Sequence, residues 1–229
     1  MDTGKLYIVA TPIGNLGDIT LRAIEILRSV DVIACEDKRH SGRLFKHYEI
    51  NARLISYHDH NKQNAAPGII KLLLDGQNVG LVTDSGTPGI SDPAYHVVNL
   101  AHAEEIEVVA IPGPCAAIAA LSVSGLPTDR FSFEGFLPLK PGKRRKRLEG
   151  LKDYPGTQIF YESPHRVVKV LSAMLEVFGD RNCAIGRELT KMHEEIVRGR
   201  ISELVERFND VSPRGEFVIL VNGCREEEP

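Results

Sequence analysis

Residues 78–93 read NVGLVTDSGTPGISDP, an apolar segment that runs directly into a loop rich in glycine and proline. A short apolar run that ends in a turn sequence is typical of a buried strand. The same plan recurs in four other segments of the N-terminal half, KLYIVA (5–10), DVIAC (31–35), ARLISY (52–57) and EVVAIPGP (107–114). We therefore expect five strands in this half, each followed by a turn of polar residues, glycine or proline.

Helical patterns lie between these strands. Apolar residues recur at helical spacing in TLRAIEILRSV (20–30), and the stretches 41–48, 62–76 and 94–105 also favour helices. In the stretch 62–76 we expect the second half to be helical, with Pro67 near the start of the helix. Strands that alternate with single helices predict a doubly wound parallel sheet, and strands that are apolar throughout are expected when helices cover both faces.

The pattern changes after Gly113. Beyond a small-residue helix expected within PCAAIAALSVSGLP, strands are predicted in FSFEGFL (131–137), TQIFYE (157–162), CAIGREL (183–189), EEIVRGR (194–200) and EFVILVNG (216–223). The last two are not each preceded by a long crossover helix, which predicts a mixed sheet. We expect an α/β protein of two domains. Residues 1–113 form the N-terminal doubly wound parallel sheet, and residues 114–229 form a C-terminal α/β domain with a mixed sheet.

Composition excludes several classes of protein. The 229 residues are 42% hydrophobic and 26% charged, which is ordinary for a soluble domain. No apolar run approaches the roughly 20 residues that cross a bilayer, and MDTGKLYIVATPIGN is not typical of a signal peptide. The four cysteines are widely spread without a CxxC pair, which favours a reducing cytoplasm over a disulfide framework or a zinc cluster. Because the net charge is −3, nucleic-acid binding requires a local basic patch.

Unusual residues collect at the predicted strand ends. The five turns are Thr11–Asn15, Glu36–His40, His58–Asn61, Asp84–Pro88 and Pro112–Cys115. Because ligands bind outside the carboxyl ends of the strands in an open parallel sheet, these turns together predict one shared cleft.

The type of turn limits the ligand. Neither GxGxxG nor GxxxxGK[ST] is present, so the usual dinucleotide fingerprint and a P-loop are absent. Pro-Gly and Ser-Gly-Thr-Pro turns present rigid backbone N–H and C=O groups, which suit a neutral or zwitterionic ligand better than a triphosphate. Glycine at positions 14, 86 and 113 would let a ligand approach the backbone, although these glycines could also serve the turns alone.

Two charged clusters are candidates for catalysis. The first is Glu36-Asp37-Lys38-Arg39-His40, whose Arg39 and His40 favour a polar substrate, although Asp37 could simply cap the following helix. The second is Arg187-Glu188-Leu189-Thr190-Lys191, in which Arg187 and Lys191 could bind phosphates and Glu188 could act as a base or orienter; the alternative is a solvated turn.

His58 and His60 lack a third ligand at a diagnostic spacing, so we expect no metal site. The absence of GxSxG argues against a hydrolase.

Six of the eight residues in KPGKRRKR (140–147) are basic. This run indicates phosphate contacts that are sensitive to salt but not specific for sequence, although a solvated basic helix is the alternative. The candidate RNA-binding residues are Lys143, Arg144, Arg145, Lys146 and Arg147.

Seven motifs carry a resemblance to a known family. They are LYIVATPIGNLGDIT (6–20), ACEDKRHS (34–41), SYHDHN (56–61), VTDSGTPGISDPAY (82–95), IPGPCAAIAALSVSGLPTDRFSFEGFLP (111–138), IFYESPHR (159–166) and RELTKMHEE (187–195). In this order, over almost the whole chain, they resemble the ribosomal RNA small subunit methyltransferase I family, a tetrapyrrole-methylase-like class of S-adenosylmethionine methyltransferases. Cys35 and Lys38 stand where the family more often has Ala and Thr.

The resemblance implies 2′-O-methylation of a cytidine in the decoding centre of 16S rRNA within the 30S ribosomal subunit. It also implies a cytoplasmic homodimer that binds no membrane, with S-adenosylmethionine in a cleft between the domains. The implied cofactor-binding residues are Pro12, Gly14, Asp84, Ser85, Gly86, Thr87, Ile90, Pro114, Cys115, Ala116, Tyr161 and Glu162.

A ribose hydroxyl is a poor nucleophile that benefits from a base or from a cation near the emerging alkoxide. We expect Glu36 or Glu188 to serve as base or orienter, and Arg39, Arg187 and Lys191 to hold phosphates or the oxyanion. Two alternatives remain open: a tetrapyrrole C-methyltransferase on the same scaffold, and a non-catalytic RNA-binding assembly factor. A porphyrinoid substrate gives no reason for the basic run, and an inert assembly factor does not need the five-turn cleft.

Overall fold

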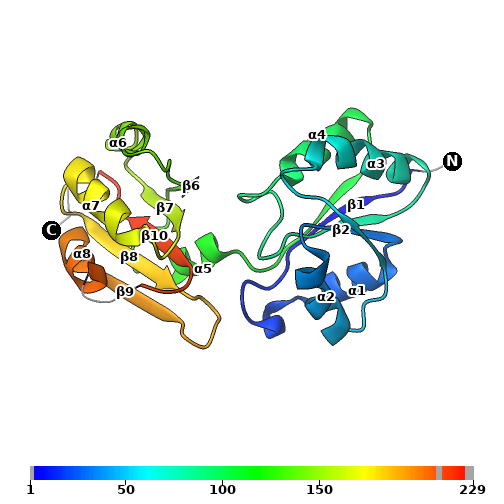
Figure 1. The fold of residues 1–229 in the computed structure, drawn as a ribbon, viewed down its shortest axis with the longest axis horizontal. Helices are drawn as coiled ribbons and strands as arrows, with labels where there is room; N and C mark the ends of the chain where they lie inside the picture. The colour runs from blue at the N-terminus through cyan, green and yellow to red at the C-terminus, as the bar shows by residue number, and fades with distance from the viewer. Residues whose placement is uncertain (1–2, 210–212, 225–229) are drawn as a thin grey trace. The chain divides into compact units, whose positions relative to one another are not determined.

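A computed structural model describes residues 3–209 and 213–224 of the chain. It forms two compact units, Met1–Cys115 and Ala116–Pro229. The sequence placed the domain boundary after Gly113, and the division in the structure follows Cys115, at the start of a helix. Each unit contains one five-stranded sheet with its own helices (Figure 1).

The first unit is a doubly wound parallel sheet, as predicted. Its strands lie in the order β3-β2-β4-β1-β5, and every neighbouring pair is parallel. The strands are β1 (Leu6–Val9), β2 (Val32–Cys35), β3 (Arg53–Ser56), β4 (Val79–Leu81) and β5 (Val108–Ile111). The helices are η1 (Leu16–Asp18), α1 (Leu21–Ser29), α2 (Lys38–His47), α3 (Lys62–Leu74) and α4 (Ala94–Ala103).

Helices cover both faces of this sheet (Figure 1). Side chains of a strand alternate between faces, and β2 shows the consequence. Its Val32 and Ala34 pack with residues of α3 and α4, whereas Ile33 and Cys35 pack with residues of α1 and α2. All four residues of β2 are therefore buried, which explains why the strand is apolar at every position.

Side-chain caps set the start of two helices. The Thr20 side chain accepts a hydrogen bond from the Ala23 N–H at α1, and the Asp37 carboxylate accepts hydrogen bonds from the Arg39 and His40 N–H groups at α2. The capping alternative for Asp37 is thus confirmed. Because of this cap, α2 begins at Lys38, three residues before the stretch in which the sequence predicted a helix.

The expected position of Pro67 near the start of a helix was wrong. The helix α3 begins at Lys62 and contains Pro67 in its interior. The proline removes one backbone hydrogen bond, but Ala66, Ile69 and Leu73 are fully buried against the sheet. Burial of this apolar face outweighs the local cost, and so the helix continues through the proline.

The second unit has the predicted mixed sheet. Its strand order is β6-β7-β10-β8-β9, in which β6 and β7 are parallel and the other pairs are antiparallel. The strands are β6 (Phe131–Phe136), β7 (Thr157–Glu162), β8 (Asn182–Arg187), β9 (Glu195–Arg200) and β10 (Phe217–Val221). The helices are α5 (Ala116–Val123), α6 (Pro141–Glu149), α7 (Val167–Phe178) and α8 (Ile201–Asn209).

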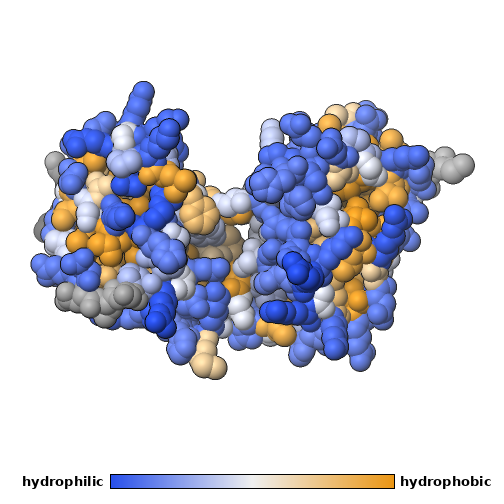
Figure 2. All heavy atoms as spheres, viewed as in Figure 1, coloured by the Kyte–Doolittle hydropathy of each residue, from blue (hydrophilic) through white to orange (hydrophobic). Residues whose placement is uncertain are grey.

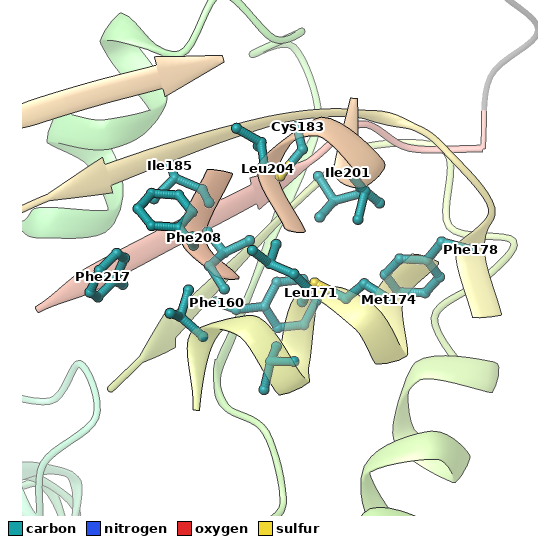
Figure 3. Packing of buried hydrophobic residues seen from close by; sticks show 14 of the residues in the cluster. Phe160, Leu171, Met174, Phe178, Cys183, Ile185, Ile201, Leu204, Phe208 and Phe217 are labelled. Atoms are coloured by element: carbon teal, nitrogen blue, oxygen red, sulfur yellow. The ribbon is translucent and has the colours of Figure 1, made fainter. Parts of the chain in front are cut away.

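One apolar cluster holds this unit together. Phe160 of β7 and Phe217 of β10 pack against Leu171 and Met174 of α7 and against Phe208 of α8 (Figure 3). The rings of Phe208 and Phe217 meet edge to face with centroids 5.6 Å apart. The helices α7 and α8 thereby fix one face of the sheet, and the strand ends on this unit are held on a rigid support.

Within residues 3–209 and 213–224, no helix has both the length and the apolar character needed to cross a membrane.

Candidate active site

The turns after β1, β4 and β5 are bound to one another. Thr11 and Gly86 exchange backbone hydrogen bonds of 2.9 and 3.1 Å. The Thr11 hydroxyl also donates to the Thr83 carbonyl at 3.1 Å, and the Thr87 hydroxyl donates to the Pro114 carbonyl at 3.0 Å. Three of the predicted turns therefore form one connected rim, although they are far apart in the sequence.

The turn after β2 joins this rim through carboxylates. The Thr83 hydroxyl and the Asp84 N–H donate to Glu36 Oε2 at 2.9 and 3.2 Å. The Asp37 N–H in turn donates to Asp84 Oδ1 at 3.1 Å. Each of these carboxylates thus accepts a backbone N–H from a neighbouring turn, and the two turns are held as a pair.

The carboxylate of Asp37 is held by the start of α2. The backbone N–H of Arg39 donates to it at 2.7 Å and that of His40 at 3.4 Å. The Arg39 hydrogen bond is the largest cause that lowers the pKa of Asp37 below its ordinary value, and the nearby cationic side chain of Arg39 lowers it further. The Arg39 side chain itself is 95% exposed, so it is open to a substrate.

The predicted glycines serve different purposes. Gly86 has a φ of 87°, a conformation that side chains rarely adopt, and it lies at the centre of the rim. At Gly113 an added Cβ would lie 2.9 Å from the Cβ of Ala10, so the glycine is required by packing within the protein. The alternative in which Gly113 serves the protein's own packing is thus supported. Gly14 is exposed beside the rim.

Other predicted cofactor residues also surround the rim. Pro12 is half-buried, Ser85 and Ile90 are exposed, and Pro114 and Cys115 are half-buried. Their surfaces are open to a ligand at the same edge of the sheet.

The turn after β3 is connected to this edge less directly. The Tyr57 hydroxyl donates to the Pro93 carbonyl at 3.0 Å, which links the end of β3 to the loop between β4 and α4. His58 and His60 lie with ring centroids 6.0 Å apart. In the part of the chain that the structure describes, no group of three His, Cys, Asp or Glu side chains is placed to hold a metal ion.

In the second unit, the charged cluster at 187–191 is internally paired. Lys191 Nζ lies 2.8 Å from Glu188 Oε1 and 2.9 Å from Glu216 Oε2, and the Glu216 N–H donates to Glu188 Oε1 at 3.0 Å. Arg187 Nε lies 3.1 Å from Glu195 Oε2. These side chains brace the β8–β9 hairpin, which does not support the expected roles of Arg187 and Lys191 in binding phosphate.

The environment of Glu188 also argues against a role as base. The hydrogen bond from Lys191 is the largest cause that lowers the pKa of Glu188, and the hydrogen bond from the Glu216 backbone lowers it further. Glu188 has a φ of 50°, and a Cβ on Gly215 would lie 2.3 Å from its Cγ. A carboxylate with a lowered pKa in such a tight position is suited to structural bracing, and Glu36 remains the candidate base.

Two predicted cofactor residues lie on β7. The Ala117 N–H at the start of α5 donates to the Tyr161 hydroxyl oxygen at 3.2 Å. The side chain of Glu162 is only 1% exposed, and it binds the Ser163 N–H at 2.8 Å and Arg166 at 3.4 Å. Burial, the largest effect, raises the pKa of Glu162. Glu162 is enclosed within the second unit, so its expected contact with a cofactor is not supported. It positions Arg166, which also donates to the Leu137 carbonyl.

The basic run forms the helix α6, anchored by the fully buried Leu148. Arg145 pairs with Glu149 and Arg147 with Glu134, whereas Arg144 is half-buried. The two lysines within α6, Lys143 and Lys146, are exposed and form no ion pair with any residue in the described ranges. Hydrophilic side chains project from this region in Figure 2. The free positive charge of the helix thus resides mainly on its lysines.

The comparisons with known proteins identify the family. A model of the tetrapyrrole (corrin/porphyrin) methylases matches residues 5–205. A ribosomal RNA small subunit methyltransferase I of Escherichia coli O157:H7 is 50% identical over 228 residues, which cover 98% of this chain and 80% of that protein. Its namesake of Vibrio cholerae is 50% identical over 224 residues, 96% of this chain and 78% of that protein. The chain belongs to the ribosomal RNA small subunit methyltransferase I family.

A solved structure shares the fold. A cobalt precorrin-4 methyltransferase of cobalamin biosynthesis superposes with a TM-score of 0.70 at 19% identity, over 95% of this chain and 94% of that one. The expected tetrapyrrole-methylase-like fold of this ribosomal RNA small subunit methyltransferase I family member is thereby confirmed.

The hydroxyls of Thr11 and Thr83 were not among the site groups predicted from the sequence. Both side chains are buried, and both bind across turns. In the sequence, each threonine follows directly after an apolar strand. A polar side chain buried at such a position is usually hydrogen-bonded, and this could have indicated its role.

We expect Glu36→Ala to lower the free energy of unfolding by about 1–3 kcal/mol, because the buried Thr83 hydroxyl and the Asp84 N–H lose their acceptor. Glu36→Gln keeps an acceptor oxygen and should lose less. Chemical denaturation followed by circular dichroism measures both changes, with Glu104→Ala on the exposed end of α4 as the control. Equal stability of wild type and Glu36→Ala would show that the bridge contributes nothing.

The hydrogen bonds of Glu188 should make the stability of the protein depend on pH. The folded-state pKa of Glu188 is lowered, so its stabilisation is present above the unfolded pKa of about 4.3 and is lost as the pH falls through the lower folded value. At pH 7, Glu188→Gln should be about 1–2 kcal/mol less stable than wild type, and the difference should shrink towards pH 3. Denaturation midpoints at several pH values test this, and a difference independent of pH would contradict it.

Proposed function

We propose that this chain transfers a methyl group from S-adenosylmethionine to small-subunit ribosomal RNA, at the 2′-oxygen of a cytidine in the decoding centre of 16S rRNA. The observation that carries the proposal is the rim at which the turns after β1, β2, β4 and β5 are joined by hydrogen bonds. The names of the relatives, which are ribosomal RNA methyltransferases, supply the class of substrate.

The donor set of the rim fits S-adenosylmethionine. Glu36, Asp37 and Asp84 place three carboxylates beside one another, which suits a ligand with a positively charged sulfur and an amino group. Gly86 lets the backbone turn where it pairs with Thr11, and the exposed Ser85 beside it adds a hydroxyl. When bound, S-adenosylmethionine supplies a methyl group that is already activated on its sulfur.

We assign the binding of this cofactor to residues of the rim and its surroundings. They are Pro12, Gly14, Asp84, Ser85, Gly86, Thr87, Ile90, Pro114 and Cys115. Contacts of Ala116 and Tyr161 with the cofactor remain predictions.

The remaining work of catalysis is to orient the nucleophile and to accept its proton. Glu36 Oε2 holds the neighbouring turn, while its Oε1 accepts no hydrogen bond from any described residue. We assign to Oε1 the hydrogen bond with the ribose 2′-hydroxyl and acceptance of its proton as the oxygen attacks. Arg39, which is almost fully exposed, and His40 of the same turn bind the adjacent phosphate.

Incubation with labelled S-adenosylmethionine and, in parallel reactions, undermethylated 30S subunits or a porphyrinoid substrate tests this function. Label in a cytidine ribose of 16S rRNA is the expected result. Label in a tetrapyrrole would favour a C-methyltransferase on the same scaffold, and no label in any substrate would favour a non-catalytic assembly factor.

Arg39→Ala should lower kcat/KM by about 10- to 100-fold, because a charged hydrogen bond to the substrate is lost. Lys46→Ala, at the other end of α2, is the control and should leave the rate unchanged.

The helix α6 is proposed to grip rRNA through phosphates, with Lys143 and Lys146 as its free cations, and with Arg144, Arg145 and Arg147 more strongly held within the protein. Replacing both lysines by alanine should weaken binding to 16S rRNA and reduce the slope of log K against log[salt] by about 1.5–2. Filter binding at several salt concentrations measures the slope. Lys71→Ala on α3 is the control, and an unchanged slope in the double variant would remove α6 from the RNA interface.

The homodimer and the cytoplasmic location expected from the resemblance remain predictions. Sedimentation of the purified chain tests the first.

A further inference from the structure

A cavity of about 260 Å³ lies in the first unit. It is lined by Asp59 and Lys62 from the start of α3, and by Ser91, Asp92, Tyr95 and His96 around the start of α4. Drug-sized ligand sites begin at about 300 Å³, so this cavity matches a single ring system. None of these residues is among those assigned above to the cofactor or to catalysis.

The loop between β4 and α4 contributes to both sites. Its first part, Asp84–Thr87, belongs to the rim, and its last part, Ser91–Pro93, lines the cavity. The loop is held at both ends, because Tyr57 binds the Pro93 carbonyl and Thr87 binds the Pro114 carbonyl. The cavity and the rim therefore share one loop, which is fixed at both places.

The charges of the cavity disfavour a phosphate. Its one lysine, Lys62, is already paired with Asp59 at 3.0 Å. The carboxylate of Asp92 accepts the N–H groups of Gly89 and Ala94 at 2.7 and 2.8 Å, and it remains an additional negative group. Burial, the largest effect, raises the pKa of Asp92. A ligand with N–H donors satisfies such oxygens, whereas an anion is repelled by them.

The aromatic side chain of the cavity is unusually exposed. Tyr95 is 73% exposed although it is large and carries a ring. An exposed aromatic ring beside hydrogen-bond acceptors is the arrangement that binds an unstacked nucleobase, in which the ring stacks on the base and the carboxylates accept from its exocyclic amino group. A nucleotide that has left the stack can present its base to such a cavity.

We propose that this cavity holds the amino-bearing base of the nucleotide whose ribose is methylated. Tyr95 stacks on the base, and Asp59 accepts from its amino group while remaining in contact with Lys62. The inference rests on the proposed function, because it names the subsite that selects the target nucleotide for that reaction. The pocket would make the enzyme prefer cytidine over uridine at the methylated position. This preference arises in the first unit and does not involve α6.

The test combines variants with altered RNA. Methylation is measured on 16S rRNA substrates that carry cytidine or uridine at the methylated position. Tyr95→Ala should lower kcat/KM by about 5- to 100-fold, whereas Tyr95→Phe should stay within about twofold of wild type, because it keeps the ring. Asp59→Ala should reduce the preference for cytidine over uridine by about 10-fold. Leu21→Ala, at an exposed position of α1, is the control.

The affinity for S-adenosylmethionine, measured by calorimetry, should be unchanged in all four variants. Wild-type kinetics in Tyr95→Ala, or equal use of the cytidine and uridine substrates by the wild type, would overturn the base pocket while leaving the methyltransferase function intact. If the wild type transfers no methyl group to RNA, the proposed function itself fails, and the pocket assignment falls with it.

Discussion

The carboxylate of Glu36 is the interaction on which the candidate site depends. One of its oxygens accepts both the buried Thr83 hydroxyl and the Asp84 N–H, and so it ties the turn after β2 to the turn after β4. The two strands are neighbours in the sheet, but their turns are separated by almost fifty residues of chain. Without this bridge a buried hydroxyl and an N–H would lack an acceptor, and the position of Asp84 would no longer be fixed.

The same arrangement explains how one fold combines rigidity with an open ligand edge. The apolar strands and the helices on both faces fix the sheet, and the helices α1 and α2 begin at side-chain caps that hold the turns before them. The polar groups at the rim are bound to one another, so the remaining backbone groups and the exposed side chains of Ser85 and Arg39 are positioned in advance for a ligand. Such preorganisation is what transfer of an already activated methyl group requires of the protein.

The two charged clusters that looked alike in the sequence have different roles. Glu36–His40 follows β2 at the rim and includes an arginine that is almost fully exposed. Arg187–Lys191 follows β8, where Glu188 is held by Lys191 and by the backbone of Glu216, and where Arg187 pairs with Glu195. The composition of the two clusters could not reveal their different roles. The difference lies in the partners that the antiparallel strands β9 and β10 bring next to Arg187–Lys191. The burial of Glu162 also depends on tertiary packing, since it pairs with Arg166, whose side chain in turn binds the Leu137 carbonyl.

The amino-acid sequence by itself determined the order of strands and helices, the parallel first sheet, the mixed second sheet and the family. Apolar periodicity and turn residues are local properties, and motifs are read along the chain. Only the tertiary structure decided which turns meet, because the strand order β3-β2-β4-β1-β5 is not the order of the chain. It also decided that α3 continues through Pro67, that Gly113 serves packing on Ala10, and that Tyr95 and Asp92 share a cavity. Each of these outcomes depends on burial or on contacts between distant segments, which no local pattern records.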